Sequence, residues 1–465
     1  MKNVGLVSRN DHDAGVATFP FQMTTSFIDS PPLHPRQRMQ QLLEKIRNND
    51  ESMICVDFCK TSMDLKLLGQ AIFHPQRCND RNNSNDDDDD DNDQMSYRSN
   101  SRLKEIRLDS IGLDGSGFFT FTRAISHCSS LTTLHLSGIK DFTQDHIACL
   151  RQALEHHESL ETLVLIHCHV KHPGLDVLTS SRLGRRLLNI NLTGCNGFED
   201  APDCGIFLRR LIQHNPKLRR LIFSRNQVQG RACVDMLSGE GFYSLEAVNL
   251  MANQISSSQG GALALAQALA RSDCCLAELN LAYNPLEDAG VALLARGLQV
   301  NRSLQMLQLK KIRLGDEGTE HLAHAIENNA QSQLQVLCLI DNEVGDKGAV
   351  ALLRINHPSL KQIEFQRNRI TDGEAIIYTL QNSNDSIEYL DVHFNKISVQ
   401  QCRTIQFWTR LNKAGRRIIR IEDQNILARS LWSFVLARVS QQPDILYYFM
   451  SQKPDLCCLG RCCPV

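Results

Sequence analysis

The stretch LAELNLAYNPLEDAG, residues 276–290, carries the pattern that decides the fold. Its leucines alternate with other residues, which predicts a short strand. Asn284 then stands where an apolar residue would continue that strand. A single asparagine of this kind indicates only a turn, because its side chain bonds nearby backbone groups and its backbone tolerates left-handed dihedral angles. Recurrence of the whole pattern would indicate a repeat architecture.

The same spacing recurs through most of the chain. Counted from Leu276, apolar residues stand at offsets 3, 5 and 10, an asparagine at 8 and a glycine at 14. Five further copies keep the asparagine, at residues 226, 253, 342, 368 and 395. Weaker copies place another residue in this slot, namely Ile111, Ile139, Cys168, Cys195 and Ile312. One more copy fits around Val56 and Phe58.

The repeats are long, and helical segments separate the strand signals. Ten intervals between Leu103 and Ile387 average about 28 residues. Segments such as GGALALAQALARS and GTEHLAHAIENN carry apolar residues three and four positions apart, which predicts helices. Each unit is therefore predicted to be a strand, a turn and a helix.

This pattern resembles the leucine-rich-repeat superfamily, specifically its ribonuclease-inhibitor-like branch, over about residues 50–425. The resemblance implies an α/β solenoid, or horseshoe, with a parallel sheet on the concave side and helices on the convex side. It also implies a structural ladder of stacked amides, formed by Asn226, Asn253, Asn284, Asn342, Asn368 and Asn395. Thiols bond backbone only weakly and isoleucine does not, so the other turns are predicted to have a different shape.

The composition of the ends differs from that of the repeats. We predict a disordered segment over 1–35, a solenoid over 36–425 that opens with a helix covering the first strand, a helical cap over 426–455 and a flexible Cys-rich tail over 456–465. The cap contains two aromatic-rich helices broken at Pro443, and the alternative is a docking helix for another protein. An acidic insertion at about 76–102 carries the run Asp86–Asp91. It is predicted to be a solvated loop, with weak binding of calcium or of a basic partner left open.

Charge and hydropathy restrict the partners. Lys and Arg number 50 against 52 Asp and Glu, which gives no general attraction to nucleic acid. No stretch approaches the roughly 18 consecutive apolar residues of a membrane-spanning helix, and no apolar segment of a secretory signal follows the start. We therefore predict a cytoplasmic protein, or a nuclear one, whose 17 cysteines are mostly buried or free thiols.

Two clusters could carry metal or lipid chemistry. HCHVKH, residues 167–172, contains three histidines, but Cys168 and Val170 occupy repeat slots, so surface histidines are predicted rather than a zinc site. The tail cysteines are predicted to be free thiols, with S-acylation or a four-thiolate metal site as alternatives, at Cys457, Cys458, Cys462 and Cys463. No nucleotide-binding loop, serine-hydrolase elbow or zinc-protease motif is present. No cofactor, metal or catalytic activity is predicted.

The function is predicted to be binding of a protein partner on the concave face. Strand residues between the buried leucines point outward there, and they include aromatic, Met and Arg side chains, which are enriched in protein interfaces. The candidate contacts are Arg220, Arg225, Asn249, Met251, Glu278, Tyr283, Lys310, Glu364 and Asp391, with Lys311, Arg367 and Phe394 beside them. The alternative is a GTPase-activating regulator of a Ran-like small GTPase, a branch that resembles this chain in repeat length and in having an acidic segment.

Overall fold

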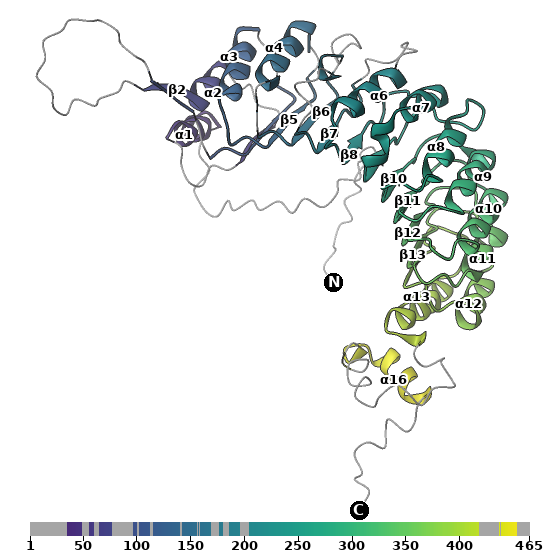
Figure 1. The fold of residues 1–465 in the computed structure, drawn as a ribbon. Helices are drawn as coiled ribbons and strands as arrows, with labels where there is room; N and C mark the ends of the chain where they lie inside the picture. Colours follow the sequence, from purple (N-terminus) through teal and green to yellow (C-terminus); the bar gives the residue numbers. More distant parts are fainter. Residues whose placement is uncertain are drawn as a thin grey trace, which may run out of the picture. The chain divides into compact units, whose positions relative to one another are not determined.

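The chain folds as a single parallel sheet with helices on one side (Figure 1). The computed structural model describes residues 35–48, 55–59, 65–76, 96–99, 102–111, 115–139, 142–155, 157, 159–168, 176–179, 186–195, 204–417, 437 and 439–452. Residues 1–34 of the predicted disordered segment 1–35, the aspartate run and the Cys-rich tail lie outside these residues, and Pro35 is the first residue of a helix. The chain divides into two units, 1–42 and 43–465. The assigned boundaries of the ends therefore stay predictions.

The 12 strands of the sheet follow one another in chain order. Leu279 pairs with Val248 on one side and with Leu307 on the other, and Leu307 pairs with Leu337, so the predicted leucine positions lie side by side. The strands are β1 (Cys55–Cys59), β4 (Glu105–Asp109), β5 (Thr133–Ser137), β6 (Thr162–Ile166), β7 (Asn189–Asn191), β8 (Arg220–Ile222), β9 (Ala247–Asn249), β10 (Glu278–Asn280), β11 (Met306–Gln308), β12 (Val336–Cys338), β13 (Gln362–Glu364) and β14 (Tyr389–Asp391).

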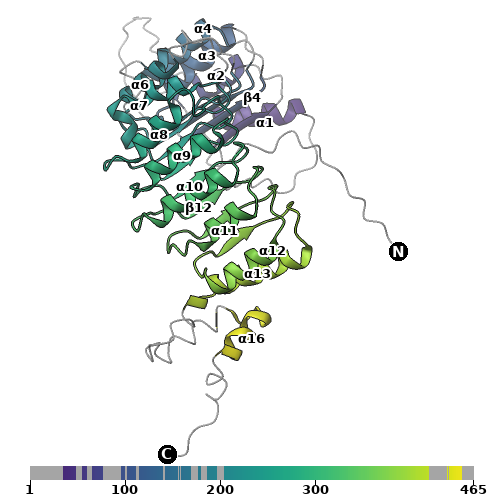
Figure 2. The same ribbon diagram turned by 90° about the vertical axis from the view of Figure 1, so that its right-hand side faces the viewer.

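Helices run between the strands and cover one face of the sheet (Figures 1 and 2). In the described part of the chain, none is long and apolar enough to span a bilayer. Those between the strands are α2 (Leu65–Ile72), α3 (Gly115–Ser126), α4 (Gln144–Glu155), η1 (Asp176–Thr179), α6 (Cys204–His214), α7 (Gly230–Leu237), η3 (Glu240–Ser244), α8 (Gly261–Leu269), α9 (Glu287–Leu298), α10 (Asp316–Glu327), α11 (Asp346–Arg354) and α12 (Gly373–Asn382). Helix α1 (Pro35–Arg47) precedes β1 in the chain, and α13 (Val399–Lys413) and α16 (Pro443–Gln452) follow β14. This arrangement confirms the predicted α/β repeat solenoid.

The ladder asparagines bond the preceding repeat as well as their own. All six side chains donate to a strand carbonyl one repeat back and accept a backbone N–H from the turn of that repeat. Asn342 is representative. Its Nδ2 donates to Leu309 O at 2.8 Å, and its Oδ1 accepts from Ile312 N at 2.9 Å and Leu314 N at 3.2 Å. Each amide therefore joins the turn of the preceding repeat to that of its own repeat.

The prediction of different turn shapes for the Cys and Ile copies is wrong. The residue before the slot has a positive φ in every described turn, including Ser110, His167 and Lys311, which precede Ile111, Cys168 and Ile312. That residue also donates its N–H to the next repeat, as Lys311 N does to Ile340 O at 2.9 Å. Any residue in the slot permits this main-chain bond. Buried Cys168 and Cys195 even bond the ladder carbonyls of Leu136 and Leu165 through Sγ.

A second polar ladder joins the opposite ends of the helices, and sequence reading missed it. Asn301 Nδ2 donates to Leu269 O at 2.8 Å, and Asn329 Nδ2 donates to Leu298 O at 2.7 Å. These carbonyls belong to the last turn of the preceding helix, where helical partners are lacking. His357, Asn384 and Asn412 continue the series with bonds to the repeat before each. Their regular spacing of about one repeat was the feature of the sequence that could have predicted this second ladder.

Helix starts are capped across repeats as well. Asp288 Oδ1 accepts from Gly315 N at 2.7 Å and Gly318 N at 3.1 Å, in the first turn of α10. Asp316 makes the same two bonds to the first turn of α11. A Cβ on Gly318 would lie 2.6 Å from Asp288 Oδ1, which explains the glycine there. Carboxylates at helix N-termini also stabilise the helix dipole.

The acidic insertion begins and ends in a hairpin rather than a loop. Strands β2 (Phe73–Gln76) and β3 (Ser96–Ser99) pair antiparallel, outside the main sheet. The sequence reading placed 96–99 in a loop because two four-residue segments separated by a polar run carry no alternating pattern of their own. The Phe73 ring stacks on His127 at 4.5 Å, after α3, which ties the base of the hairpin to the repeats.

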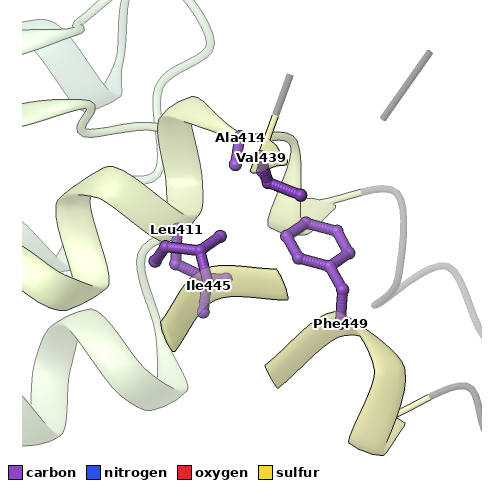
Figure 3. Close-up of a cluster of buried hydrophobic side chains, with 5 residues drawn as sticks. All are labelled: Leu411, Ala414, Val439, Ile445 and Phe449. Carbon is purple, nitrogen blue, oxygen red and sulfur yellow. The ribbon is translucent and has the colours of Figure 1, made fainter. Parts of the chain in front are cut away.

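Beyond the last described strand, α16 packs against α13 (Figure 3). Leu411 of α13 and Ala414, the C-cap of this helix, form a buried cluster with Val439, Ile445 and Phe449. Outside this cluster, Arg410 bonds Gln442 and Asp444. Helix α16 begins at Pro443, the predicted break, where proline suits the first helical position.

Replacing a ladder amide should destabilise the solenoid. Asn342→Ala leaves the buried carbonyl of Leu309 and the buried N–H groups of Ile312 and Leu314 without partners. We expect a loss of about 2–4 kcal/mol in the free energy of unfolding, measured by urea denaturation. Asn382→Ala is the matched control, because Asn382 is exposed and its bond to Tyr378 O lies within its own helix, and it should cost about 0.5 kcal/mol or less. Equal losses would contradict a structural ladder.

Candidate functional site

The face of the sheet opposite the helices, called the open face below, presents two rows of side chains. In β4, β5 and β6 the first, third and fifth residues are half-buried and the second and fourth are buried, so alternate side chains point away from the helices. Register places Arg220, Ala247, Glu278 and Met306 in the first row. It places Asn249, Asn280 and Gln308 in the second.

A third row, called the turn row, follows the strands. Its members are the residues that precede the ladder slot, and their left-handed backbone is shared by every described turn. The side chains of this row differ in size and charge from repeat to repeat. From β8 to β14 the row reads Arg225, Ala252, Tyr283, Lys311, Asp341, Arg367 and Phe394.

Cations and an aromatic ring meet at the centre of the open face. Lys310 Nζ lies 5.4 Å and Lys311 Nζ 5.7 Å from the centroid of the Tyr283 ring, so both are within cation–π range. Lys311 also pairs with Asp341 at 3.6 Å. In the turn row, Ala252 stands between Arg225 and Tyr283, so a small side chain lies between two large ones.

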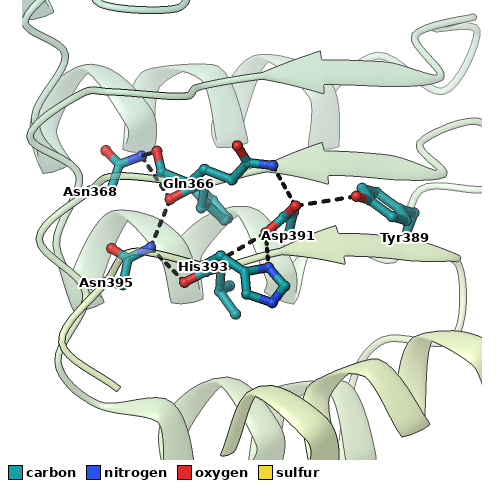
Figure 4. Close-up of polar contacts among 8 residues, drawn as sticks. Gln366, Asn368, Tyr389, Asp391, His393 and Asn395 are labelled. Carbon is teal, nitrogen blue, oxygen red and sulfur yellow. Dashed lines mark hydrogen bonds and ion pairs between the residues drawn. The ribbon is translucent and has the colours of Figure 1, made fainter. Parts of the chain in front are cut away.

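A polar network occupies the open face at β14 (Figure 4). Asp391 accepts from Gln366 Nε2, from Tyr389 OH at 3.2 Å and from the His393 N–H at 3.0 Å, and His393 Nδ1 lies 2.6 Å away. Burial opposes ionisation of this carboxyl, but the bonds from His393 and Gln366 outweigh it, and the pKa of Asp391 is lowered. Burial, with the charge of Asp391 added to it, raises the pKa of Tyr389.

The opposite end of the open face is also internally paired. Arg107 Nε donates to Glu105 Oε1 at 2.6 Å, within β4. Burial lowers the pKa of His135 in the neighbouring strand, and the positive charge of Arg107 adds to this effect. In the described part of the chain, no group of three His, Cys, Asp or Glu side chains could hold a metal ion. Of the predicted surface histidines, His167 is exposed, and His169 and His172 lie outside the described residues.

The structure brings the predicted candidates onto this one face, but some of their side chains are buried there. Met251 is 4% exposed and Asp391 8%, so neither has much free side chain. Asn249 Oδ1 accepts the Met251 N–H at 2.9 Å, an intrinsic turn bond that Asn191 and Asn280 repeat. The exposed or half-buried candidates are Arg220, Arg225, Asn249, Glu278, Tyr283, Lys310 and Glu364.

Sequence reading overlooked Tyr389. Its side chain is 47% exposed, and the neighbouring Phe394, named from the sequence, is 74% exposed. Tyr389 has the same offset in its repeat as Arg220 and Glu278, so the signal was present. Arg367 lies over the Phe394 ring at 5.1 Å.

Comparison with known proteins agrees with this geometry. A family model described as Leucine Rich repeat matches residues 272–295. Ribonuclease inhibitor of Sus scrofa is 32% identical over 170 residues, 36% of each chain. The chain is a leucine-rich-repeat protein of the ribonuclease-inhibitor-like type. This confirms the resemblance that the repeat spacing indicated.

Other similarities to this leucine-rich-repeat chain are longer but weaker. The NACHT, LRR and PYD domains-containing protein 9 of Bos taurus is 24% identical over 328 residues, 60% of this chain and 32% of that protein. The chain thus spans about a third of the length of either relative. An internalin structure from Listeria monocytogenes covers 75% of this chain and 88% of its own, at 15% identity and a TM-score of 0.38.

Removing Asp391 should loosen the end of the sheet. In Asp391→Ala, the donors from Gln366, Tyr389 and His393 lose their acceptor. We expect amide hydrogen exchange in 389–395 to accelerate about tenfold or more at pH 7. Glu364→Ala is the control, because Glu364, in register with Asp391, accepts a side-chain bond from Gln362 in its own strand. An equally fast exchange in the control would refute a specific role for Asp391.

The pH dependence follows from the lowered pKa. Asp391 is charged more easily in the folded than in the unfolded chain, so its stabilising effect is fully present above the unfolded pKa of about 3.9. The effect is lost as pH falls through the lower folded-state pKa. The difference in exchange rate between the unsubstituted protein and Asp391→Asn should therefore shrink below about pH 3.9. A difference that grows on acidification would contradict this assignment.

Proposed function

We propose that this scaffold binds a protein partner on the open face of its sheet and catalyses no reaction. The observation that carries the proposal is the group of Arg225, Tyr283, Lys310 and Lys311 at the centre of that face. Aromatic and Arg side chains dominate the binding energy of protein interfaces. The proposed partner contacts are the exposed and half-buried members of the predicted set.

The rigidity of the face supports the proposal. Each strand from β4 to β13 is bonded to a strand on either side, and the turn that follows it is held by the next repeat. A partner that binds this face therefore has little backbone to order, which reduces the entropic cost of association. A solenoid offers such a surface without a conformational change.

Three related assignments stay predictions. The alternative, stimulation of GTP hydrolysis by a Ran-like GTPase, is tested by measuring that hydrolysis with and without this protein. The cytoplasmic or nuclear location is part of the proposal. S-acylation of Cys457, Cys458, Cys462 and Cys463 lies outside the described residues and is tested by palmitate labelling.

The docking face is tested by affinity capture from native lysate with two matched variants. Arg220→Glu, Arg225→Glu and Tyr283→Ala together alter the open face, and the captured set should lose at least one partner by about tenfold. Arg231→Glu, Arg302→Glu and Tyr378→Ala make the same chemical changes at exposed positions outside the open face, and capture should be retained. Thermal melting of both variants checks the fold. An unchanged partner set in the first variant would exclude this face.

A further inference from the structure

The carboxyl ends of the strands carry an excess of cations. Three of them are matched by a carboxylate of a neighbouring repeat. Lys311 pairs with Asp341 at 3.6 Å. Arg313 pairs with Glu287 at 2.8 Å, and Arg369 pairs with Glu343 at 2.9 Å. These pairs neutralise the edge locally and leave little charge for a ligand.

Three further cations on the same edge have no such partner. Within the described part of the chain, no carboxylate pairs with Arg225, Lys310 or Arg367. Arg225 and Arg367 are exposed and Lys310 is half-buried. Two of the three lie over aromatic rings, Lys310 over Tyr283 and Arg367 over Phe394. The rings hold these cations in place without neutralising them.

The carboxylates of the open face are charged, but the ones nearest this edge are hydrogen-bonded or ion-paired within the chain. Glu364 accepts from Gln362, and Asp391 is surrounded by donors. Asp341 is paired with Lys311. Glu278 stands five residues before Tyr283, at the other end of its strand and roughly 15 Å away along the chain. The edge therefore presents positive charge above a strip of aromatic surface.

The spacing of the three cations sets the size of the ligand. Arg225 follows β8, Lys310 follows β11 and Arg367 follows β13, so five strand intervals separate the outer two. At about 4.8 Å per interval, this distance is roughly 24 Å. An extended peptide covers it with about seven residues at roughly 3.3 Å each. A single carboxylate cannot reach all three cations, whereas an extended segment with several carboxylates can.

We propose that the partner presents an extended acidic segment of about seven residues, which crosses the turn row from β8 to β13 and pairs its carboxylates with Arg225, Lys310 and Arg367. This inference rests on the proposed function and names the chemical class of the partner. The aromatic rings of Tyr283 and Phe394 contact the apolar parts of the same segment. On the rest of the open face, positive and negative side chains alternate. The acidic segment therefore contacts only this edge.

The probe is a fluorescein-labelled nine-residue peptide of alternating glutamate and alanine, measured by fluorescence anisotropy with the full chain at low salt. The combined variant Arg225→Glu, Lys310→Glu and Arg367→Glu should weaken binding at least about tenfold. The corresponding triple glutamine variant should weaken it less. Arg231→Glu, Arg302→Glu and Lys347→Glu change the net charge equally at exposed positions outside the turn row and should shift the dissociation constant less than about twofold. Circular dichroism checks the fold of each variant.

Several results would overturn the inference. A glutamine-alanine peptide that binds equally well would show that carboxylates are not recognised. A ten-nucleotide uridine RNA that competes more strongly than the peptide would identify nucleic acid as the occupant. Tighter peptide binding after Asp86–Asp91 are changed to asparagine would identify the chain's own aspartate run as the occupant. If the glutamate peptide fails to bind while open-face variants still lose captured partners, the acidic class is wrong and the docking face stands.

Discussion

Each strand from β4 to β13 ends in a turn whose peptide groups are buried, and buried peptide groups need hydrogen-bond partners. The turns meet this need across repeats. The residue before the ladder slot donates its N–H forward, as Tyr283 does to Lys310 O. The ladder asparagine reaches back, as Asn284 does to Leu250 O. A repeat without neighbours would leave both groups unpaired, so the array is stable only as a stack.

The same hydrogen bonds between repeats also fix the backbone from which the side chains of the turn row project. Because the turn is held by main-chain bonds, the residue at its left-handed position can be Arg, Tyr, Lys, Asp or Phe without a change of backbone. Each repeat therefore presents one side chain whose type the turn does not restrict. Neighbouring side chains of this row are about one strand spacing apart. Recognition can vary along the edge while the scaffold stays the same. This separation makes Arg225, Tyr283 and Arg367 candidates for binding rather than for stability.

The parts of the open face differ in how much bonding capacity is left for a partner. At β14, the donors around Asp391 use most of its oxygen lone pairs within the chain. At β4, Arg107 and Glu105 satisfy one another. At the centre and along the turn row, the unmatched cations rest on rings instead of carboxylates. Binding energy is therefore expected from a few residues there, as in most protein interfaces.

The sequence by itself determined the repeat length, the parallel order of strands and the six ladder asparagines, because burial of one apolar set per repeat leaves a periodic record in the chain. It also placed Arg225, Tyr283 and Lys310 on one face. Only the tertiary structure decided that Met251 and Asp391 are buried, that the Cys and Ile turns keep the common shape, and which cations lack a carboxylate. These properties depend on contacts between repeats about 28 residues apart, and such contacts are set by how the repeats stack in space.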